Sequence, residues 1–382
     1  MRREPLRTTT VHRGAVGEMG SLYTRLLVTD ADGPNAGAIL LTWELRLGVA
    51  DDGGPSFPIW RSLDGGHSWA TLSEVPDLRY GYGNRYQPML YELPADIAHL
   101  RRGDLLLAGN AIPADGSSTH LVLYSSSDGG RTWAYESTVD SGGPAIYSPR
   151  SDAATTAVWE PDLHLIEGVL HCFFADEREK DRGMLQVIAR RSSTDLRTWS
   201  EKDLISGVGD RFHRPGMFVG TGEMPDGVHR AVIEVVGPAE VPVHLLTSRD
   251  GTDWGDPAAV GLPLRAEDGV AISGTPTIAW RERADGAVEM IATGRHSLRD
   301  GVAGNRALRS LDLGATWTSF ELPTPAERLL TGDGSGYSQS VRWNADGDLV
   351  HATTVRSATG SHDVVVSVAL AGSAGPRDQH AR

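Results

Sequence analysis

The feature of this sequence that most constrains its fold is a short pattern that recurs along the chain. Three copies are complete, SLDGGHSW from Ser62, SSDGGRTW from Ser126 and SLDLGATW from Ser310. Two shortened copies read STDLRTW from Ser193 and SRDGTDW from Ser248. Their aspartates are Asp64, Asp128, Asp195, Asp250 and Asp312, spaced by about 60 residues. Repetition at a period of this length indicates an architecture built from repeated structural units.

Each residue type in the pattern has a physical use. The aspartate accepts hydrogen bonds from backbone amides that follow it and closes a tight turn. Glycine supplies the positive φ that such a turn needs, and the tryptophan ring is expected to pack into a neighbouring sheet. Three β-like runs separated by turn signals precede each copy, for example PDLHLI, VLHCFFA and MLQVIARRS before the third. Three strands before the pattern and one after it make a four-stranded unit, so we assign the five aspartates a structural role.

The last unit, SVRWNADGDLVHATTVR followed by DVVVSVAL, has strands but no copy of the pattern. A strand from residues near 8–16 would complete it and close the units into a ring without exposed sheet edges. The sequence therefore predicts an all-β fold, a six-bladed β-propeller with four antiparallel strands per blade. We expect one domain over residues 8–371, with disordered tails at 1–7 and 372–382.

Composition and charge exclude several classes of function. A formal net charge of −14 argues against nucleic acid as a partner, and no apolar run is long enough for a membrane helix. Cys172 is the only cysteine, and the 13 histidines show no paired metal spacing, so we expect no metal and no cofactor. The first residues lack an apolar signal region, which predicts a cytoplasmic protein, or a secreted one if an export signal was removed. A monomer is expected, and the charged segment EREKDRG at 177–183 is interpreted as a solvated turn.

Functional residues of a propeller gather where first strands begin and second strands end, because both points lie at one mouth of the central channel. Four residues that precede a proline mark first-strand starts, and alignment of the other two units adds two more: Gln87, Glu160, Arg214, Thr275, Arg25 and Gln339. Second strands are predicted to end at Glu44, Asn110, Asp176, Glu234 and Arg295. The sequence therefore predicts a polar channel mouth.

Two carboxylates stand out among these residues. Glu234 lies in the apolar run AVIEVVG and Glu160 is wedged between Trp159 and Pro161, where an unpaired carboxylate is unfavourable. A structural ion pair of Glu234 with Arg214 or Arg295 is one explanation. The other is glycoside hydrolysis, in which two carboxylates flank the scissile bond. The residues predicted to bind substrate are Arg25, Tyr86, Gln87, Trp159, Asp176, Arg214, Arg295 and Gln339. Tyr23, Tyr86, Trp159 and Tyr337 could stack on sugar faces or serve as packing.

The recurring pattern is similar to the Asp box (the BNR repeat) of the sialidase-like superfamily, which implies the propeller fold. In a sialidase, Tyr337 would pair with Glu234, and three arginines (Arg25, Arg214 and Arg295) would clamp the substrate carboxylate. The usual Arg-Ile-Pro opening is absent, however, since this chain reads YTRLLV. The general acid that such an enzyme needs has only Asp51 and Asp52 as candidates.

The chain resembles glycoside hydrolase family 93 more closely. The WEP segment around Glu160, Glu234 at a strand end in the next unit, and Tyr337 in GYSQS match that family. The resemblance implies a retaining exo-α-1,5-L-arabinanase that releases arabinobiose from an oligosaccharide or polysaccharide, with Glu160, Glu234 and Tyr337 as catalytic residues. Glu160 would be the acid/base and Glu234 the nucleophile, and the reverse assignment stays open. The alternatives are an exo-α-sialidase and a glycan-binding propeller without catalysis.

Overall fold

The computed structural model describes residues 6–15, 18–30, 35–47, 54–145, 154–209 and 212–370. The C-terminal segment 372–382 and the pair Asp51 and Asp52 lie outside these ranges. The described residues form an all-β structure whose helical elements are two short 3₁₀ turns, η1 (Glu179–Arg182) and η2 (Ala326–Arg328). Within the same ranges, we find no helix with the length and apolar character to cross a membrane.

The strands of the described residues form seven antiparallel sheets. Sheet I contains β2 (Glu18–Val28), β3 (Ile39–Leu47), β4 (Phe57–Ser62) and β5 (Ala70–Val75). Sheet II contains β6 (Asn84–Glu92), β7 (Leu105–Ala111), β8 (Thr119–Ser126) and β9 (Ala134–Gly142). Sheet III contains β10 (Val158–Ile166), β11 (Val169–Asp176), β12 (Val187–Ser193) and β13 (Asp203–Gly207). Sheet IV contains β14 (Arg214–Glu223), β15 (His229–Val236), β16 (Val243–Ser248) and β17 (Leu262–Pro263).

The remaining strands complete the set. Sheet V contains β19 (Thr277–Glu282), β20 (Val288–Thr293), β23 (Arg306–Ser310) and β24 (Thr318–Glu321). Sheet VI contains β25 (Ser340–Trp343), β26 (Leu349–Arg356), β27 (His362–Ala369) and β1 (Leu6–His12). A small sheet of β18 (Ala271–Ser273), β21 (His296–Arg299) and β22 (Val302–Gly304) lies beside sheet V and was not expected from the sequence.

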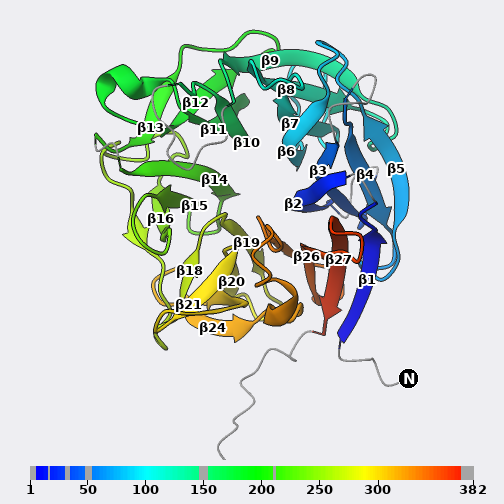
Figure 1. Cartoon of the computed structure of the whole chain (residues 1–382), viewed down its shortest axis with the longest axis vertical. Coiled ribbons are helices and arrows are strands. Elements are labelled where there is room, and N and C mark those ends of the chain that lie inside the picture. The colour runs from blue at the N-terminus through cyan, green and yellow to red at the C-terminus, as the bar shows by residue number, and fades with distance from the viewer. Residues whose placement is uncertain are drawn as a thin grey trace, which may run out of the picture.

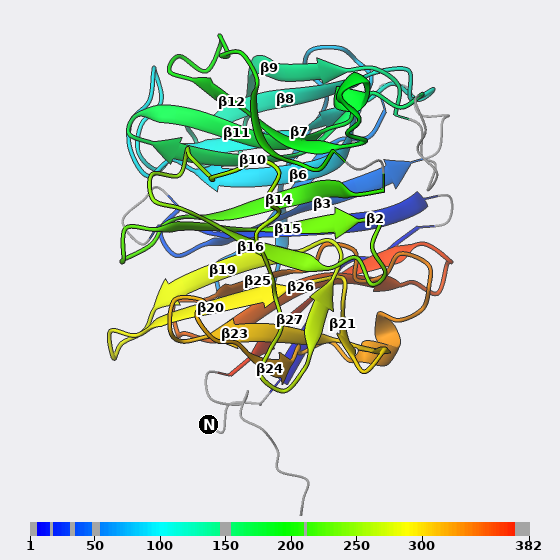
Figure 2. The same ribbon diagram turned by 90° about the vertical axis from the view of Figure 1, so that its left-hand side faces the viewer.

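The four-stranded sheets are arranged around a central axis (Figure 1). Their first strands lie nearest this axis, and the side view shows most strands running roughly along it (Figure 2). Apolar side chains fill the space between neighbouring sheets. Leu40 of sheet I and Leu107 of sheet II share one such core, for example, and Phe173 of sheet III packs on Phe218 of sheet IV with ring centroids 4.3 Å apart. Similar cores join each pair of sheets, including sheet VI to sheet I, which gives a propeller-like arrangement.

The N-terminal strand completes the last sheet, as the sequence predicts. Strand β1 pairs antiparallel with β27, from Leu6 opposite Ala369 to His12 opposite Val364. It begins at Leu6, two residues before the expected segment 8–16. The first and last strands of the described chain are therefore hydrogen-bonded to each other.

The repeated pattern forms the turn that the sequence predicts. In sheet II, Asp128 accepts hydrogen bonds from the backbone N–H groups of Arg131 and Thr132, both at 2.9 Å, and from the Thr132 hydroxyl at 2.6 Å. The Trp133 indole donates to Ser73 of sheet I at 3.1 Å. Although partial burial opposes it, these donors lower the pKa of Asp128 to about 2. The five aspartates are therefore structural.

Candidate active site

Each first strand carries one non-glycine residue with a positive φ at the same place, where the strand begins or bulges. These residues are Tyr23 (57°), Gln87 (59°), Glu160 (61°), Met217 (56°), Thr275 (39°) and Ser338 (56°). Such angles are uncommon outside glycine. The predicted ring of first-strand residues is therefore right at Gln87, Glu160 and Thr275. At the other three places, the predicted residues Arg25, Arg214 and Gln339 lie one to three residues from the positive-φ residue, and Arg214 is the first residue of β14, as predicted.

Hydrogen bonds from this ring tie each first strand to the preceding sheet. The donors are the backbone N–H groups of the six residues: Gln87 to Glu44 Oε2 (3.3 Å), Glu160 to Gln87 Oε1 (3.1 Å), Met217 to Glu160 Oε2 (2.7 Å), Thr275 to Glu234 Oε2 (2.6 Å), Ser338 to Thr275 Oγ1 (3.0 Å) and Tyr23 to the Tyr337 carbonyl (3.2 Å). Both glutamates therefore have a structural use through Oε2. Among the described residues, none donates a hydrogen bond to Oε1 of either glutamate, which leaves that oxygen for other chemistry.

The two glutamates converge on the same short piece of backbone. Gly216 is the cross-strand partner of Glu234, and a side chain on Gly216 would approach Glu160 Oε2 to 3.4 Å. The next residue, Met217, donates its N–H to Glu160. Each glutamate is 8% exposed, so both are buried but retain contact with solvent. Glu160 from sheet III and Glu234 from sheet IV therefore face one site.

The surroundings of Glu160 and Glu234 affect the pKa values of their carboxyl groups differently. Burial, and then the negative charge of Glu234, raise the pKa of Glu160 to about 8. Burial also raises the pKa of Glu234, but the Thr275 N–H and the charges of Arg214 and Arg295 oppose that rise. At neutral pH, Glu160 is therefore mostly protonated. The ionised form of Glu234 is stabilised by the Thr275 N–H and by the charges of Arg214 and Arg295. Two carboxyl groups with separated pKa values are suited to acid and nucleophile roles.

Arg214 does not form the ion pair with Glu234 that the sequence left open. Its guanidinium pairs with Glu177 and donates to Gln186 at 2.9 Å. Glu177 is 3% exposed, so this first residue of the charged segment is not solvated, and the interpretation of 177–183 as a solvated turn is wrong there. Since Arg214 lowers the pKa of both catalytic candidates, its positive charge acts on the site while Glu177 holds it in place.

Several predicted aromatic and cationic residues border this pair. Tyr86 and Trp159 are partly exposed and form an edge-to-face pair with ring centroids 6.1 Å apart, next in sequence to Gln87 and Glu160. Tyr337 is partly exposed, with its ring 6.4 Å from that of Tyr23. Tyr86, Trp159 and Tyr337 are therefore partly exposed near the two glutamates, and Arg295 lies close enough to act on Glu234.

Three other predicted substrate-binding residues, Gln339, Gln87 and Arg25, have internal partners instead. Gln339 is fully buried, donating to Gly294, Arg295 and Asn305 and accepting from His351. Gln87 accepts from Asn110 and Glu160. The Arg25 guanidinium covers the Tyr23 ring at 3.8 Å and donates to Ser338 Oγ at 2.7 Å. We assign these three residues to internal packing and hydrogen bonding.

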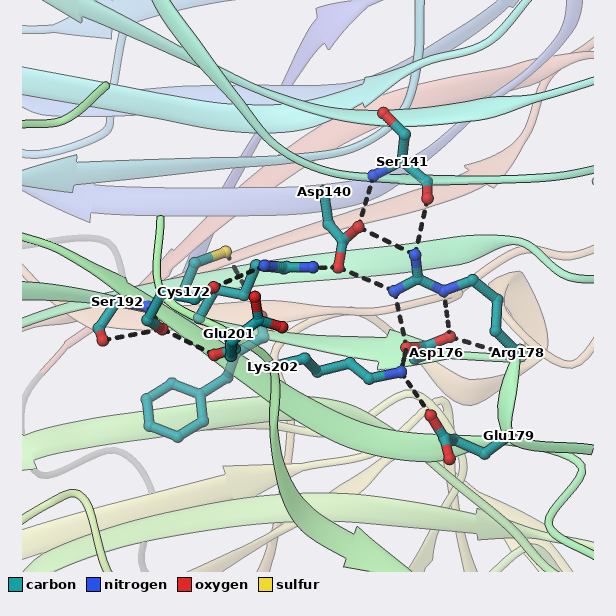
Figure 3. A network of polar contacts seen from close by, with 12 residues as sticks. Asp140, Ser141, Cys172, Asp176, Arg178, Glu179, Ser192, Glu201 and Lys202 are labelled. Carbon is teal, nitrogen blue, oxygen red and sulfur yellow. Dashed lines mark hydrogen bonds and ion pairs between the residues drawn. The ribbon is translucent and has the colours of Figure 1, made fainter. Parts of the chain in front are cut away.

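Asp176, the last residue of β11, belongs to a buried ion network (Figure 3). It is 0% exposed, and its two oxygens accept from Arg178 and Lys202 at 2.6 to 2.9 Å. Arg178 also pairs with Asp140 of sheet II, and Lys202 pairs with Glu179. Although burial opposes it, Arg178 and Lys202 lower the pKa of Asp176. We therefore assign Asp176 to this network, which joins two sheets, rather than to substrate binding. Among the described residues, no cluster of three or more His, Cys, Asp or Glu side chains could hold a metal ion.

Comparisons with known proteins give this geometry a context. No protein-family model and no curated protein sequence matches the chain. The structure of Penicillium chrysogenum α-L-arabinanase with arabinobiose is 29% identical, with 94% of this chain and 97% of that one covered and a TM-score of 0.80. The family 93 α-L-arabinofuranosidase of Fusarium graminearum, also with arabinobiose, is 26% identical, with 94% and 96% covered and a TM-score of 0.77.

The chain is similar to the family 93 glycoside hydrolases. The resemblance predicted from the sequence is confirmed. A sialidase of Streptococcus pneumoniae is 10% identical, covers 96% of this chain and 71% of its own, and has a TM-score of 0.57. The leech intramolecular trans-sialidase is 12% identical, with 91% and 67% covered and a TM-score of 0.57. These two show a common sialidase-like fold alone, whereas the family 93 structures combine the fold with higher sequence identity.

Proposed function

We propose that the chain is a six-bladed β-propeller and a retaining, exo-acting glycoside hydrolase that cleaves α-1,5-linked L-arabinofuranosyl oligosaccharides and releases arabinobiose. Six four-stranded sheets with an apolar core between each neighbouring pair support the blade count, with the small sheet as an insertion in the fifth blade. The observation that carries the reaction is the convergence of Glu160 and Glu234 at Gly216 and Met217. The arabinobiose in the family 93 structures supports the substrate class.

The two pKa shifts support one assignment of the roles. Glu160, protonated below about pH 8, is the general acid that donates its proton to the glycosidic oxygen as the bond to the anomeric carbon breaks. Glu234, whose ionised form is favoured by Thr275, Arg214 and Arg295, attacks that carbon and forms a glycosyl ester. Glu160, now ionised, then takes a proton from water, whose oxygen displaces Glu234 from the sugar. Two inversions at one carbon give net retention, which requires carboxyl groups roughly 5–5.5 Å apart.

Tyr337 is the third catalytic residue of this proposal, and Tyr86, Trp159 and Arg295 are its substrate-binding groups, whereas Arg214 acts on the two glutamates through its charge. The sialidase alternative has less support, because Arg25 covers Tyr23 and Arg214 is paired with Glu177. Two of the three arginines needed for a carboxylate clamp therefore already have internal partners. The absence of nucleic acid and membrane partners, the monomeric state and the cytoplasmic location remain predictions.

The test is hydrolysis of linear α-1,5-arabino-oligosaccharides by the wild type and by Glu160→Gln and Glu234→Gln. Each substitution keeps a side-chain oxygen for the backbone N–H that the glutamate accepts. We expect each to lower kcat by about 100-fold or more, since general acid catalysis alone contributes roughly 10²–10⁴. Glu44→Gln is the matched control, because Glu44 accepts the equivalent hydrogen bond from the backbone N–H of Gln87 and is not one of the two proposed catalytic carboxyl groups.

Two outcomes would contradict the proposal. If Glu160→Gln, Glu234→Gln and Glu44→Gln all retain wild-type rates, Glu160 and Glu234 serve only to hydrogen-bond neighbouring sheets. If the wild type turns over neither arabino-oligosaccharides nor sialosides but binds glycans, the chain is a binding module. The first anomer to appear, followed by ¹H NMR, separates retention from inversion.

A further inference from the structure

The residue Tyr23 is only 2% exposed, and among the described residues none accepts a hydrogen bond from its hydroxyl. The hydroxyl oxygen is not one of the polar side-chain atoms that are cut off from solvent without a partner, so it retains contact with solvent. Buried phenol groups ordinarily find a partner. Other tyrosines here do so: Tyr124 donates to Asn84 at 3.2 Å, and Tyr91 accepts from the N–H of Leu165 at 2.9 Å. The Tyr23 hydroxyl is therefore a donor at the solvent-accessible end of a buried ring, where a ligand can reach it.

The face of the Tyr23 ring is not available to stack on a sugar. The Arg25 guanidinium lies 3.8 Å from the ring centroid, and Arg25 is fixed by Ser338 Oγ at 2.7 Å. The backbone of Tyr23 is fixed as well, since its N–H donates to the Tyr337 carbonyl. The ring is therefore immobilised, and its hydroxyl is the group that remains to interact with a ligand.

Position and charge place that hydroxyl at the candidate active site. Tyr23 is the residue of sheet I that corresponds to Glu160 of sheet III in the ring of positive-φ residues. Burial raises the pKa of Tyr23 far above its usual value. Arg25 opposes that rise, whereas Glu160, Asp162 and Glu44 increase it. The phenol therefore stays protonated at every working pH, and Glu160 is the carboxylate that acts on it most strongly.

We propose that Tyr23 is a substrate-binding residue whose hydroxyl donates a hydrogen bond to an oxygen of the sugar held between Glu160 and Glu234. This inference rests on the proposed glycoside hydrolase function. The hydroxyl and ring oxygens of a furanose are the acceptors that a neutral phenol can recognise. Because the donor is rigid and already free of a protein partner, binding of the sugar breaks no internal hydrogen bond, so the new bond contributes fully to recognition.

The test is Tyr23→Phe, which removes the hydroxyl and leaves the ring and its contact with Arg25. We expect kcat/KM for linear arabino-oligosaccharides to fall roughly 10-fold, the usual effect of one lost hydrogen bond of about 1.4 kcal/mol. The melting temperature should stay the same or rise slightly, since no hydrogen bond within the protein is lost. The alkaline limb of the pH–rate profile should not move.

Tyr124→Phe is the matched control, because it also removes a buried phenol hydroxyl. In that variant Asn84 loses its donor, so we expect a lower melting temperature with unchanged kcat/KM. The opposite responses of the two variants separate a substrate contact from a structural one.

Three results would overturn the inference. Normal kcat/KM for Tyr23→Phe in an active enzyme would refute the substrate contact alone. A displaced alkaline limb would show that Tyr23 acts through Glu160 rather than on the sugar. Absence of turnover by the wild type would refute the proposed function itself, and with it this role of Tyr23.

Discussion

Replacing Glu160 by glutamine should stabilise the protein, and the gain should depend on pH. Burial and the charge of Glu234 raise the pKa of Glu160 from 4.5 to about 8. Between those values the folded protein holds a proton that the unfolded chain releases. The contribution of Glu160 to stability is therefore fully present below about pH 4.5 and is lost as pH rises toward 8 and above. Glutamine carries no charge at any pH and avoids this loss.

The size of the effect follows from the shift. At about 1.36 kcal/mol per pKa unit, the wild type loses roughly 3 kcal/mol by pH 7 and about 5 kcal/mol by pH 9, relative to pH 4. With an unfolding entropy of about 2.1 cal/mol/K per residue, the larger figure corresponds to a shift in melting temperature of about 6 °C. The glutamine oxygen can still accept the N–H of Met217, so that hydrogen bond does not offset the gain.

The measurement is urea or thermal unfolding of the wild type and Glu160→Gln at intervals from pH 4 to pH 9. Glu74→Gln, at an exposed position, is the control for loss of one negative charge. We expect the two stability curves of wild type and Glu160→Gln to coincide near pH 4 and to separate progressively above it. Parallel curves over the whole range would refute the reasoning, because they would mean that Glu160 is ionised at neutral pH like an exposed carboxyl.

Two further predictions concern the rate and the blade turns. The value of kcat/KM should fall on the alkaline side with an apparent pKa near 8, because Glu160 loses the proton that it donates, and a pH–rate profile that stays flat to pH 9 would argue against its role as acid. Asp128→Ala should lower the free energy of unfolding by about 2 kcal/mol, since the Arg131 and Thr132 donors lose their acceptor, while kcat/KM stays unchanged. Denaturant titration together with the arabino-oligosaccharide assay checks the second prediction, and an inactive but fully stable variant would contradict it.

The features that sequence could predict are those encoded within one unit. The Asp128 turn depends on residues within a few positions of each other, so its pattern is legible along the chain. The strand needed to complete sheet VI follows from counting strands per unit. Glu160 and Glu234 were identifiable because a carboxylate between apolar neighbours is unusual in any environment.

The remaining features depend on partners that are distant in sequence. The X-Pro pattern located the start of β14 at Arg214, but a bulge later in that strand places the positive-φ residue at Met217. Asp176 looked like a channel residue, but Lys202, which follows the next strand, binds its carboxylate. Glu177 lies in a segment of charges that is typical of solvent-exposed turns, and its burial against Arg214 could not be read from composition.

The pairing of β1 with β27 has a consequence for how the chain acquires its structure. Leu6 leaves the ribosome long before its partner Ala369, which is among the last of the described residues to be synthesised. At about 5–20 residues per second, the N-terminal strand waits roughly 20 to 70 s for the strand that it pairs with. During that time its backbone N–H and C=O groups are available to other strands, including those of a second chain. Recombinant yield should therefore be sensitive to synthesis rate and to chaperones that shield unpaired strands.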